Sequence, residues 1–285
     1  MKHSTKIILL ASAGLISFGL ILSIIGLICG GSLTNIMESD LWRFVGYKKV
    51  HYDNTFENDN TYHISASSIR SISIDWIDGD ISVIPYDGDD IILTESSNKE
   101  LDDEYCLRYR IKHGVLQVEY CKSNYYIGFS FSDNDDNLPI KALEIKVPKN
   151  IAESLQELDV DAISSDIYLE NIAAQALSID TISGNLTGNL LLADDITFDS
   201  TSGSMDLKLS HCPSSFEMYT ISGDCVVYLP KKPSLDCDFD TISGNFHSEF
   251  DINFKDEDEF IIGSGKASFE FSSTSGDMTI KKLKL

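Results

Sequence analysis

The second half of the chain repeats one alternation of apolar and polar residues around a Ser-Gly pair. Clear copies are residues 180–186, which read Asp-Thr-Ile-Ser-Gly-Asn-Leu, and residues 240–246, which read Asp-Thr-Ile-Ser-Gly-Asn-Phe. Short alternating runs of this kind predict β-strands. We call the glycine place position 0. It falls at residues 79, 165, 184, 203, 223, 244 and 276, with serine in place of glycine at 165.

Two other positions are apolar in every copy, which makes them the expected core. Position −5 holds Ile74, Val160, Ile179, Phe198, Met218, Phe239 and Phe271. Position +2 holds Ile81, Ile167, Leu186, Met205, Cys225, Phe246 and Met278. From residue 165 to Gly244 the copies follow one another at steps of 19, 19, 20 and 21 residues. A fixed period with strand-like residues predicts an all-β protein, a β-solenoid of about 20 residues per rung, in which each rung buries its apolar face against its neighbours.

Position −2 is also mostly apolar. Because side chains alternate along a strand, positions −2, 0 and +2 are expected to share the inward face, with a corner or bulge near −4 and −3. The glycines would then point inward, where there is no space for a side chain or where the backbone needs an unusual φ. These structural glycines are Gly79, Gly184, Gly203, Gly223, Gly244 and Gly276.

Polar residues form equally regular rows. Serine recurs at position −1, Asp, Asn or Ser at position +1, and aspartate at position −4. One interpretation is structural: these side chains accept hydrogen bonds at turns. The alternative is a divalent cation held by stacked carboxylates, although the calcium-binding nonapeptide is absent. The candidate ligands are Asp161, Asp180, Asp199 and Asp240.

The N-terminus carries a different signal. Residues 7–29 are 23 uncharged, mostly apolar residues, preceded by Lys2 and Lys6. At ~1.5 Å per residue, a helix of this length spans a ~30 Å hydrocarbon core. We therefore expect a tail at 1–6, a transmembrane anchor at 7–31, a linker at 32–63 and a repeat domain at 64–285. A cleaved signal peptide and a lipoprotein modified at Cys29 are the alternatives. The basic tail favours an inside N-terminus and an extracytoplasmic repeat domain.

Between the first copy and the regular array lies an insertion, at about residues 85–157. It contains an expected hairpin over 104–121, turning at His113-Gly114, and an expected strand over 140–147. Cys106 and Cys121 are equally distant from the turn and could form a disulfide, although they fall at a hydrogen-bonded pair, the less favourable site for one. Acidic loops are expected at 132–137 and 255–259.

The net charge narrows the range of partners. The chain has 45 acidic and 22 basic residues, a formal charge of −23. Such a surface repels nucleic acid and favours cationic ligands. The sequence has no P-loop, no metalloprotease motif and no serine-hydrolase motif, so we expect neither an enzyme nor a cofactor. A glycan-active β-helix enzyme remains the less favoured alternative.

The segment at 143–148, Leu-Glu-Ile-Lys-Val-Pro, and the serial Thr-Ile-Ser-Gly phrases resemble the bacterial putative-adhesin family of β-strand-repeat domains. The resemblance covers about residues 64–285. It implies a cell-envelope protein of a family whose function is largely unknown, with some members acting in envelope-stress responses. The expected function is a membrane-anchored binding or scaffolding module for wall polymer or cationic peptide. The alternative is a regulatory protein acting on a membrane sensor.

Overall fold

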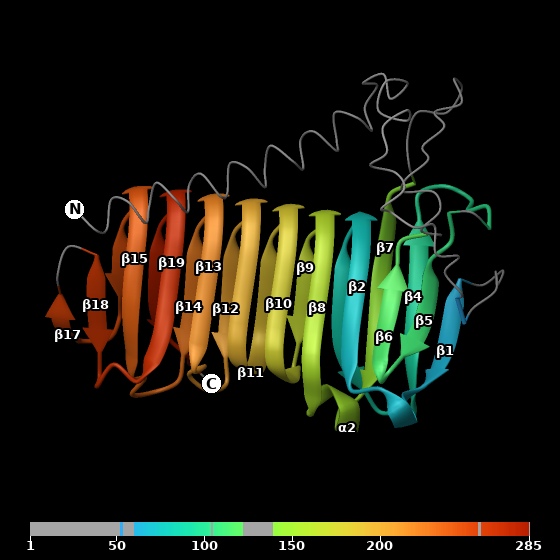
Figure 1. Ribbon diagram of the computed structural model, residues 1–285, viewed down its shortest axis with the longest axis horizontal. Helices are drawn as coiled ribbons and strands as arrows, with labels where there is room; N and C mark the ends of the chain where they lie inside the picture. The colour runs from blue at the N-terminus through green and yellow to red at the C-terminus, as the bar shows by residue number, and fades with distance from the viewer. Residues whose placement is uncertain (1–51, 54–59, 104, 122–138, 256–257, 285) are drawn as a thin grey trace, which may run out of the picture. The chain divides into compact units, whose positions relative to one another are not determined.

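The computed structural model describes residues 52–53, 60–103, 105–121, 139–255 and 258–284, all of which belong to one compact unit. This unit is all-β (Figure 1), as the sequence predicts. Within these ranges, no helix is long and apolar enough to cross a bilayer. The predicted anchor at 7–31 and the acidic loop at 132–137 lie outside the described residues.

Short strands follow one another along the chain, with the 3₁₀ turn η3 (Ala66–Ser68) and the short helix α2 (Lys149–Ala152) between them. The strands are β1 (Thr61–Ser65), β2 (Ser71–Asp78), β3 (Ile81–Tyr86), β4 (Asp90–Ser97), β5 (Arg108–Lys112), β6 (Val115–Glu119), β7 (Lys141–Pro148), β8 (Leu155–Ser164), β9 (Ile167–Glu170), β10 (Ala173–Ser183), β11 (Leu186–Ser202), β12 (Met205–Leu209), β13 (Ser215–Ser222), β14 (Cys225–Leu229), β15 (Leu235–Ser243), β16 (Phe246–Ser248), β17 (Ile252–Lys255), β18 (Glu259–Ile262), β19 (Ala267–Ser275) and β20 (Met278–Lys282).

Parallel rungs form the body of the unit, as expected for a solenoid. Each rung is a strand of one sheet, a corner at the Ser-Gly phrase, and a strand of a second sheet. The first sheet, sheet B, runs β5-β6-β2-β8-β10-β11-β13-β19-β15-β18-β17. The second, sheet A, runs β1-β4-β7-β3-β9-β11-β12-β14-β20-β16. Strand β11 is long enough to belong to both.

The rungs do not stack in chain order. The last rung, β19–β20, inserts between β13–β14 and β15–β16, and the insertion contributes a rung, β6–β7, outside β2–β3. Antiparallel strands cover parts of the outermost rungs: β4 and β5 at one end and β18 at the other. Antiparallel cover at the ends of a parallel stack protects edge strands from uncontrolled pairing.

The core lies where the two constant apolar positions predict it. Side chains at −5 are buried in every rung, and those at +2 in every rung except the partly buried Phe246. Aromatic rings stack between adjacent rungs, with centroid separations of 4.9 Å for Phe216–Phe269 and 5.2 Å for Phe239–Phe271.

Position −2 corrects the sequence prediction. Ile163, Ile221 and Ile242 are 41%, 40% and 81% exposed, whereas Thr181 and Thr220 at −3 are buried. The inward alternation therefore continues from −5 to −3 without a bulge, and the corner lies at −1 to +1. A tight corner there turns the chain from one sheet to the other, which leaves the −2 side chains on the outer face.

The glycines are required for a reason different from the predicted one. A Cβ built on Gly203 would lie 2.1 Å from the carbonyl oxygen of Gly184, and one on Gly223 would lie 1.9 Å from that of Gly203. The missing side chains thus face the backbone of the adjacent rung, along the stack, and not the core. An unusual backbone φ was the second reason expected for glycine at position 0. Among these glycines, only Gly79 and Gly184 have a positive φ.

The hairpin β5–β6 has the predicted register and turns at His113 and Gly114, whose φ angles are 52° and 84°. The possible disulfide is not formed: Cys106 and Cys121 are both buried, and neither is bridged. The strand ladder ends at Arg108 and Glu119, and the Cys106 thiol donates instead to the Asp102 carbonyl at 3.4 Å. Burial raises the pKa of Cys106 to about 11, which keeps this thiol protonated.

Part of the segment predicted as a linker belongs to the folded unit. Strand β1 begins at Thr61. The Asp53 carboxylate accepts a hydrogen bond from the backbone of Ile111 at 2.6 Å, and Tyr52 donates to Glu119 at 2.8 Å.

Candidate functional site

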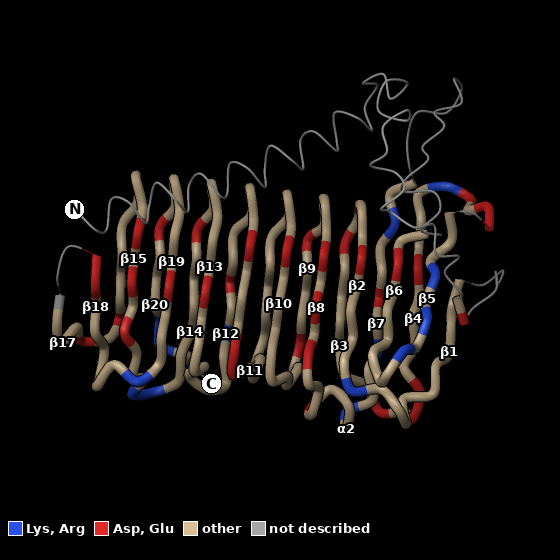
Figure 2. The backbone as a smooth tube through the Cα atoms, in the orientation of Figure 1, with Lys and Arg blue, Asp and Glu red and all other residues tan. Residues whose placement is uncertain are grey.

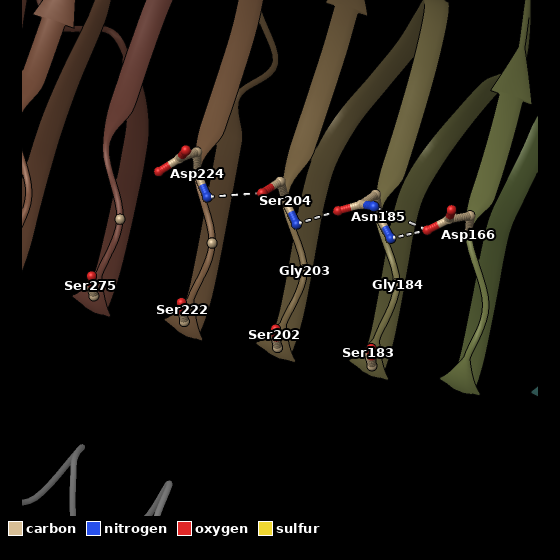
Figure 3. A pocket seen from close by; sticks show the side chains of 12 residues that line it. Asp166, Ser183, Gly184, Asn185, Ser202, Gly203, Ser204, Ser222, Asp224 and Ser275 are labelled. Atoms are coloured by element: carbon tan, nitrogen blue, oxygen red, sulfur yellow. Dashed lines mark hydrogen bonds between the residues drawn. The ribbon is translucent and has the colours of Figure 1, made fainter.

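Two rows of acidic side chains run along the stack, and they differ in what they bind. In the +1 row, the side chains from Asp166 to Asp277 each accept a hydrogen bond from the backbone of the adjacent rung (Figure 3). Asp166 Oδ1 accepts from the Asn185 N–H at 2.8 Å, and Asn185 Oδ1 accepts from the Ser204 N–H at 3.0 Å. The row continues from Ser204 through Asp224 and Asp277 to Asn245. This confirms the structural interpretation, with hydrogen bonds that join rungs instead of closing single turns.

The corners form a polar groove of about 460 Å³, seen in Figure 3. Its walls are the serines at −1, the glycines and the +1 side chains. Because the +1 oxygens already accept backbone hydrogen bonds, they serve to hold the rungs together, and the carboxylates best placed to meet a ligand are in the other row.

The −4 row lies on the outer face of sheet B. Strand register places Glu119, Asp75, Asp161, Asp180 and Asp199 on five successive strands, ~4.8 Å apart. Acidic residues recur in this way from strand to strand in Figure 2. Arg110 pairs with Glu119 at 3.3 Å at one end of the row. In the part of the chain that the structure describes, no ion pair involves Asp161, Asp180 or Asp199.

Crowding changes the acidity of this row. Burial between the neighbouring strands, followed by repulsion from adjacent carboxylates, raises the pKa of Asp75, Asp161 and Asp180 to about 6. Burial also raises the pKa of Asp199, against a hydrogen bond with Asp180 that lowers it. The outer ends of these side chains retain contact with solvent, which screens the repulsion. At neutral pH these carboxylates are ionised and their negative charges are concentrated on this face. In mild acid they bind protons and the repulsion between them falls.

Stability should therefore fall as pH rises through the window from 3.8, the ordinary pKa, to about 6. In that window the folded chain holds protons that the unfolded chain has released, so ionisation of the row opposes folding. We expect a higher melting temperature at pH 5 than at pH 7.5, measured by circular dichroism. The substitution Asp180→Asn should raise the melting temperature at pH 7.5 and so reduce the difference in melting temperature between pH 5 and pH 7.5. The substitution Asp251→Asn should do neither. A melting temperature that rises from pH 5 to pH 7.5 would contradict this expectation.

The cation hypothesis is not supported by this geometry. Asp161, Asp180 and Asp199 are neighbours in the row, but the strands of Tyr219 and Ser272 separate Asp199 from Asp240. Within the described ranges, no group of three or more His, Cys, Asp or Glu side chains could hold a metal ion. In-register strands point their side chains in parallel, whereas calcium requires oxygens that converge from several directions.

An apolar row accompanies the acidic one. The −2 residues Ile163 and Ile182 lie two residues further along the same strands as Asp161 and Asp180, a separation of ~6.6–6.8 Å. Thr201 takes this position beside Asp199, and isoleucine returns on the next strand at Ile221. Sequence reasoning missed this row because it assigned −2 to the core. The outer face of sheet B therefore offers parallel acidic and apolar rows.

A buried ion pair, also missed, secures the end of the stack near β6–β7. Lys141 is fully buried; its Nζ lies 3.0 Å from Glu95 Oε2 and donates to the Tyr105 carbonyl at 2.6 Å. The ammonium group lies over the Trp76 and Tyr120 rings, 5.0 and 3.9 Å from their centroids. Burial lowers the pKa of Lys141, and the Glu95 charge opposes that effect. The alternation of side chains along β7 could have predicted the burial of Lys141, because Lys141 lies on the same inward face of the strand as Leu143, Ile145 and Val147.

Parallel rungs with Ser-Gly corners define the chain as a β-strand-repeat domain. The Toastrack DUF4097 family model matches it twice, at residues 69–227 and 154–281. The chain belongs to this family, which confirms the resemblance noted in the sequence. No match was found among curated proteins.

Three solved structures are similar to the chain. A putative cell adhesion protein from Clostridium sporogenes is 12% identical, with a TM-score of 0.45, over 78% of this chain and 98% of its own. A putative adhesin from Bacteroides fragilis is 11% identical, with a TM-score of 0.35, over 78% and 96%. A putative lipid binding protein from Parabacteroides distasonis is 13% identical, with a TM-score of 0.27, over 83% and 100%.

Proposed function

We propose that this protein is a non-enzymatic binding module of the bacterial cell envelope whose acidic face takes a cationic ligand. The observation that carries the proposal is the −4 row, where Asp161, Asp180 and Asp199 stand on adjacent strands with no ion-pair partner among the described residues. Uncompensated like charges held close together attract cations, because a cationic ligand relieves their mutual repulsion.

The ligand that suits this face is an extended peptide with cationic and apolar side chains. The acidic row would pair with its lysines or arginines, and the adjacent isoleucine row would contact its apolar side chains. The formal charge of −23 would increase the rate of encounter with such a peptide. For the other expected partners, a wall polymer or a membrane sensor protein, no group of the described residues forms a matching surface.

The uncharged run at 7–29 supports a membrane anchor, and the basic tail supports a repeat domain outside the cell. Such a placement would expose the acidic face to wall components and peptides. Protease treatment of intact, wall-stripped cells tests the orientation, because cleavage within 64–285 requires an outside domain. Protection that disappears on lysis would favour the regulatory alternative, with the domain inside.

Neutralising the row should weaken binding. We expect the triple variant Asp161→Asn, Asp180→Asn, Asp199→Asn to bind a labelled oligolysine peptide about tenfold less tightly at low salt, a loss of about 1.4 kcal/mol. Fluorescence anisotropy on the full chain in a non-ionic detergent measures this, and binding by the wild-type chain should weaken steeply with added salt.

A matched control removes the same number of negative charges from residues outside the acidic row. The exposed residues Asp89, Glu100 and Glu153 lie outside the row, and their Asn or Gln variants should bind nearly as wild type does. Equal losses in the two triple variants would mean that only net charge matters, and the acidic face would not be a site.

A further inference from the structure

The rung β15–β16 ends the stack with an open edge. Strand β18 covers only Leu235–Asp238 of β15, and among the described strands β16 pairs only with β20. On that side, therefore, no described strand pairs with residues Thr241–Ser248, which we call the open edge. In Figure 1, β15 extends well beyond the end of β18.

The open edge presents hydrogen-bonding groups that are used at the internal corners. At Gly223, for example, the N–H donates to the Ser275 carbonyl of the next rung at 3.2 Å, and the Cys225 N–H donates to the Asp277 carbonyl at 2.8 Å. The equivalent donors at the open edge, the Gly244 and Phe246 N–H groups, have no acceptor among the described residues, and Asn245 Oδ1 accepts nothing there.

The local sequence is that of an internal rung. Residues 241–245 read Thr-Ile-Ser-Gly-Asn, identical to 181–185, which lie in the middle of the stack. Repeat proteins ordinarily change the terminal repeat to make its outer side polar. Here Ile242 remains, and it is 81% exposed, about twice as much as Ile163 or Ile221 at the same position.

We propose that the open edge is a site of β-strand addition for a glycine-containing strand of a partner protein. An edge with unused main-chain groups binds an extended segment through main-chain hydrogen bonds. Glycine is required because a Cβ on the incoming corner residue would meet the Gly244 carbonyl, just as a Cβ on Gly244 would lie 2.0 Å from that of Gly276.

Charge specifies the partner further. The exposed side chains of Asp251, Asp258 and Glu259 follow the open edge closely in the chain or lie in the loop and strand that pair with β15. Basic residues flanking the glycine corner of the partner would complement them.

The opposite end of a second copy does not supply such a strand. There the corner backbone is already bonded: the Asn98 N–H donates to the Ile140 carbonyl at 3.2 Å, and the Ile140 N–H donates to Asn98 Oδ1 at 3.1 Å. Head-to-tail stacking of identical chains is therefore blocked at this corner, which favours a different protein as the partner.

A peptide with the sequence of residues 266–284 is a suitable probe. It contains a Ser-Gly-Asp corner that fits the equivalent corner of β13–β14, and its four basic and two acidic residues give a net charge of +2 with blocked termini. We expect saturable binding of the labelled peptide to the full chain in detergent, by fluorescence anisotropy. A peptide with Gly276→Val has the same charge and should bind at least tenfold more weakly.

Protein variants separate this site from the acidic face. At about 0.5 M salt, which screens the electrostatic binding expected of the acidic face, Ile242→Lys should weaken peptide binding about tenfold, whereas Ile163→Lys, at the same position of an internal rung, and the Asp161/Asp180/Asp199 triple variant should not. The proposal is overturned if the glycine and valine peptides bind equally, if Ile163→Lys is as damaging as Ile242→Lys, or if no saturable binding occurs. Concentration-dependent dimerisation by light scattering, lost in Ile242→Lys, would assign the open edge to a second copy and overturn the choice of partner.

Discussion

Replacing Lys141 with methionine is expected to lower the free energy of unfolding by about 3–5 kcal/mol, the largest effect of any single substitution considered. The methionine retains most of the apolar volume but removes the charge that lies 3.0 Å from Glu95. Among the described residues, the buried Glu95 carboxylate would then keep only the Leu107 N–H, at 2.9 Å, as a hydrogen-bond donor. The Tyr105 carbonyl would also lose the hydrogen bond from Lys141 Nζ.

Urea denaturation followed by circular dichroism measures this loss, with two controls. The double variant Lys141→Met, Glu95→Gln should recover part of the stability, because no uncompensated charge remains inside. Lys149→Met removes an exposed ion pair with Asp87, at 2.8 Å, and should cost less than about 1 kcal/mol. A Lys141→Met chain as stable as the Lys149→Met chain would show that the buried pair does not hold the end of the stack.

The second large effect is expected for Gly203→Val, at about 3 kcal/mol or more. The new Cβ would lie 2.1 Å from the Gly184 carbonyl oxygen and 2.9 Å from the Ser200 hydroxyl. Since no contact of this kind is tolerated, adjacent rungs must separate at the corner. Separation would stretch the hydrogen bond from the Ser204 N–H to Asn185, which is 3.0 Å in the native chain.

The matched control places the same new residue one position earlier. Ser202 is exposed on the outer side of the corner, and Ser202→Val should change the urea midpoint little, because valine suits a strand and has space there. Similar midpoints for the two valine variants would contradict the close approach of the rungs.

Local features of the fold could be predicted from the sequence. The hairpin register follows from the His113-Gly114 turn, because a two-residue turn leaves a single way to pair the flanking strands. The core positions −5 and +2 follow from their constancy across the copies. The orientation of position −2 could not be obtained in this way, since an isoleucine beside a corner is compatible with either face until the corner itself is located.

The candidate site was only partly predictable. The sequence identified the aspartates at −4 and +1 as two rows, but it could not show that the +1 carboxylates accept backbone hydrogen bonds while Asp161, Asp180 and Asp199 lack ion-pair partners in the described region. That difference depends on the distance from each side chain to the adjacent rung, which is a property of the stack. The sequence also left open whether Cys106 and Cys121 are bridged; the structure has no bridge, because the strands stop pairing before they reach these residues.

By itself, therefore, the sequence determined the strands, their period, the glycine corners and the all-β class, because each depends on residues close together in the chain. Only the tertiary structure decided the order of the rungs, the burial of Lys141 and the position of the open edge at Gly244. The physical reason is that rungs with the same corner form equivalent hydrogen bonds with any neighbour. Their order thus depends on the path of the chain between rungs, and the repeat pattern contains no information about that path.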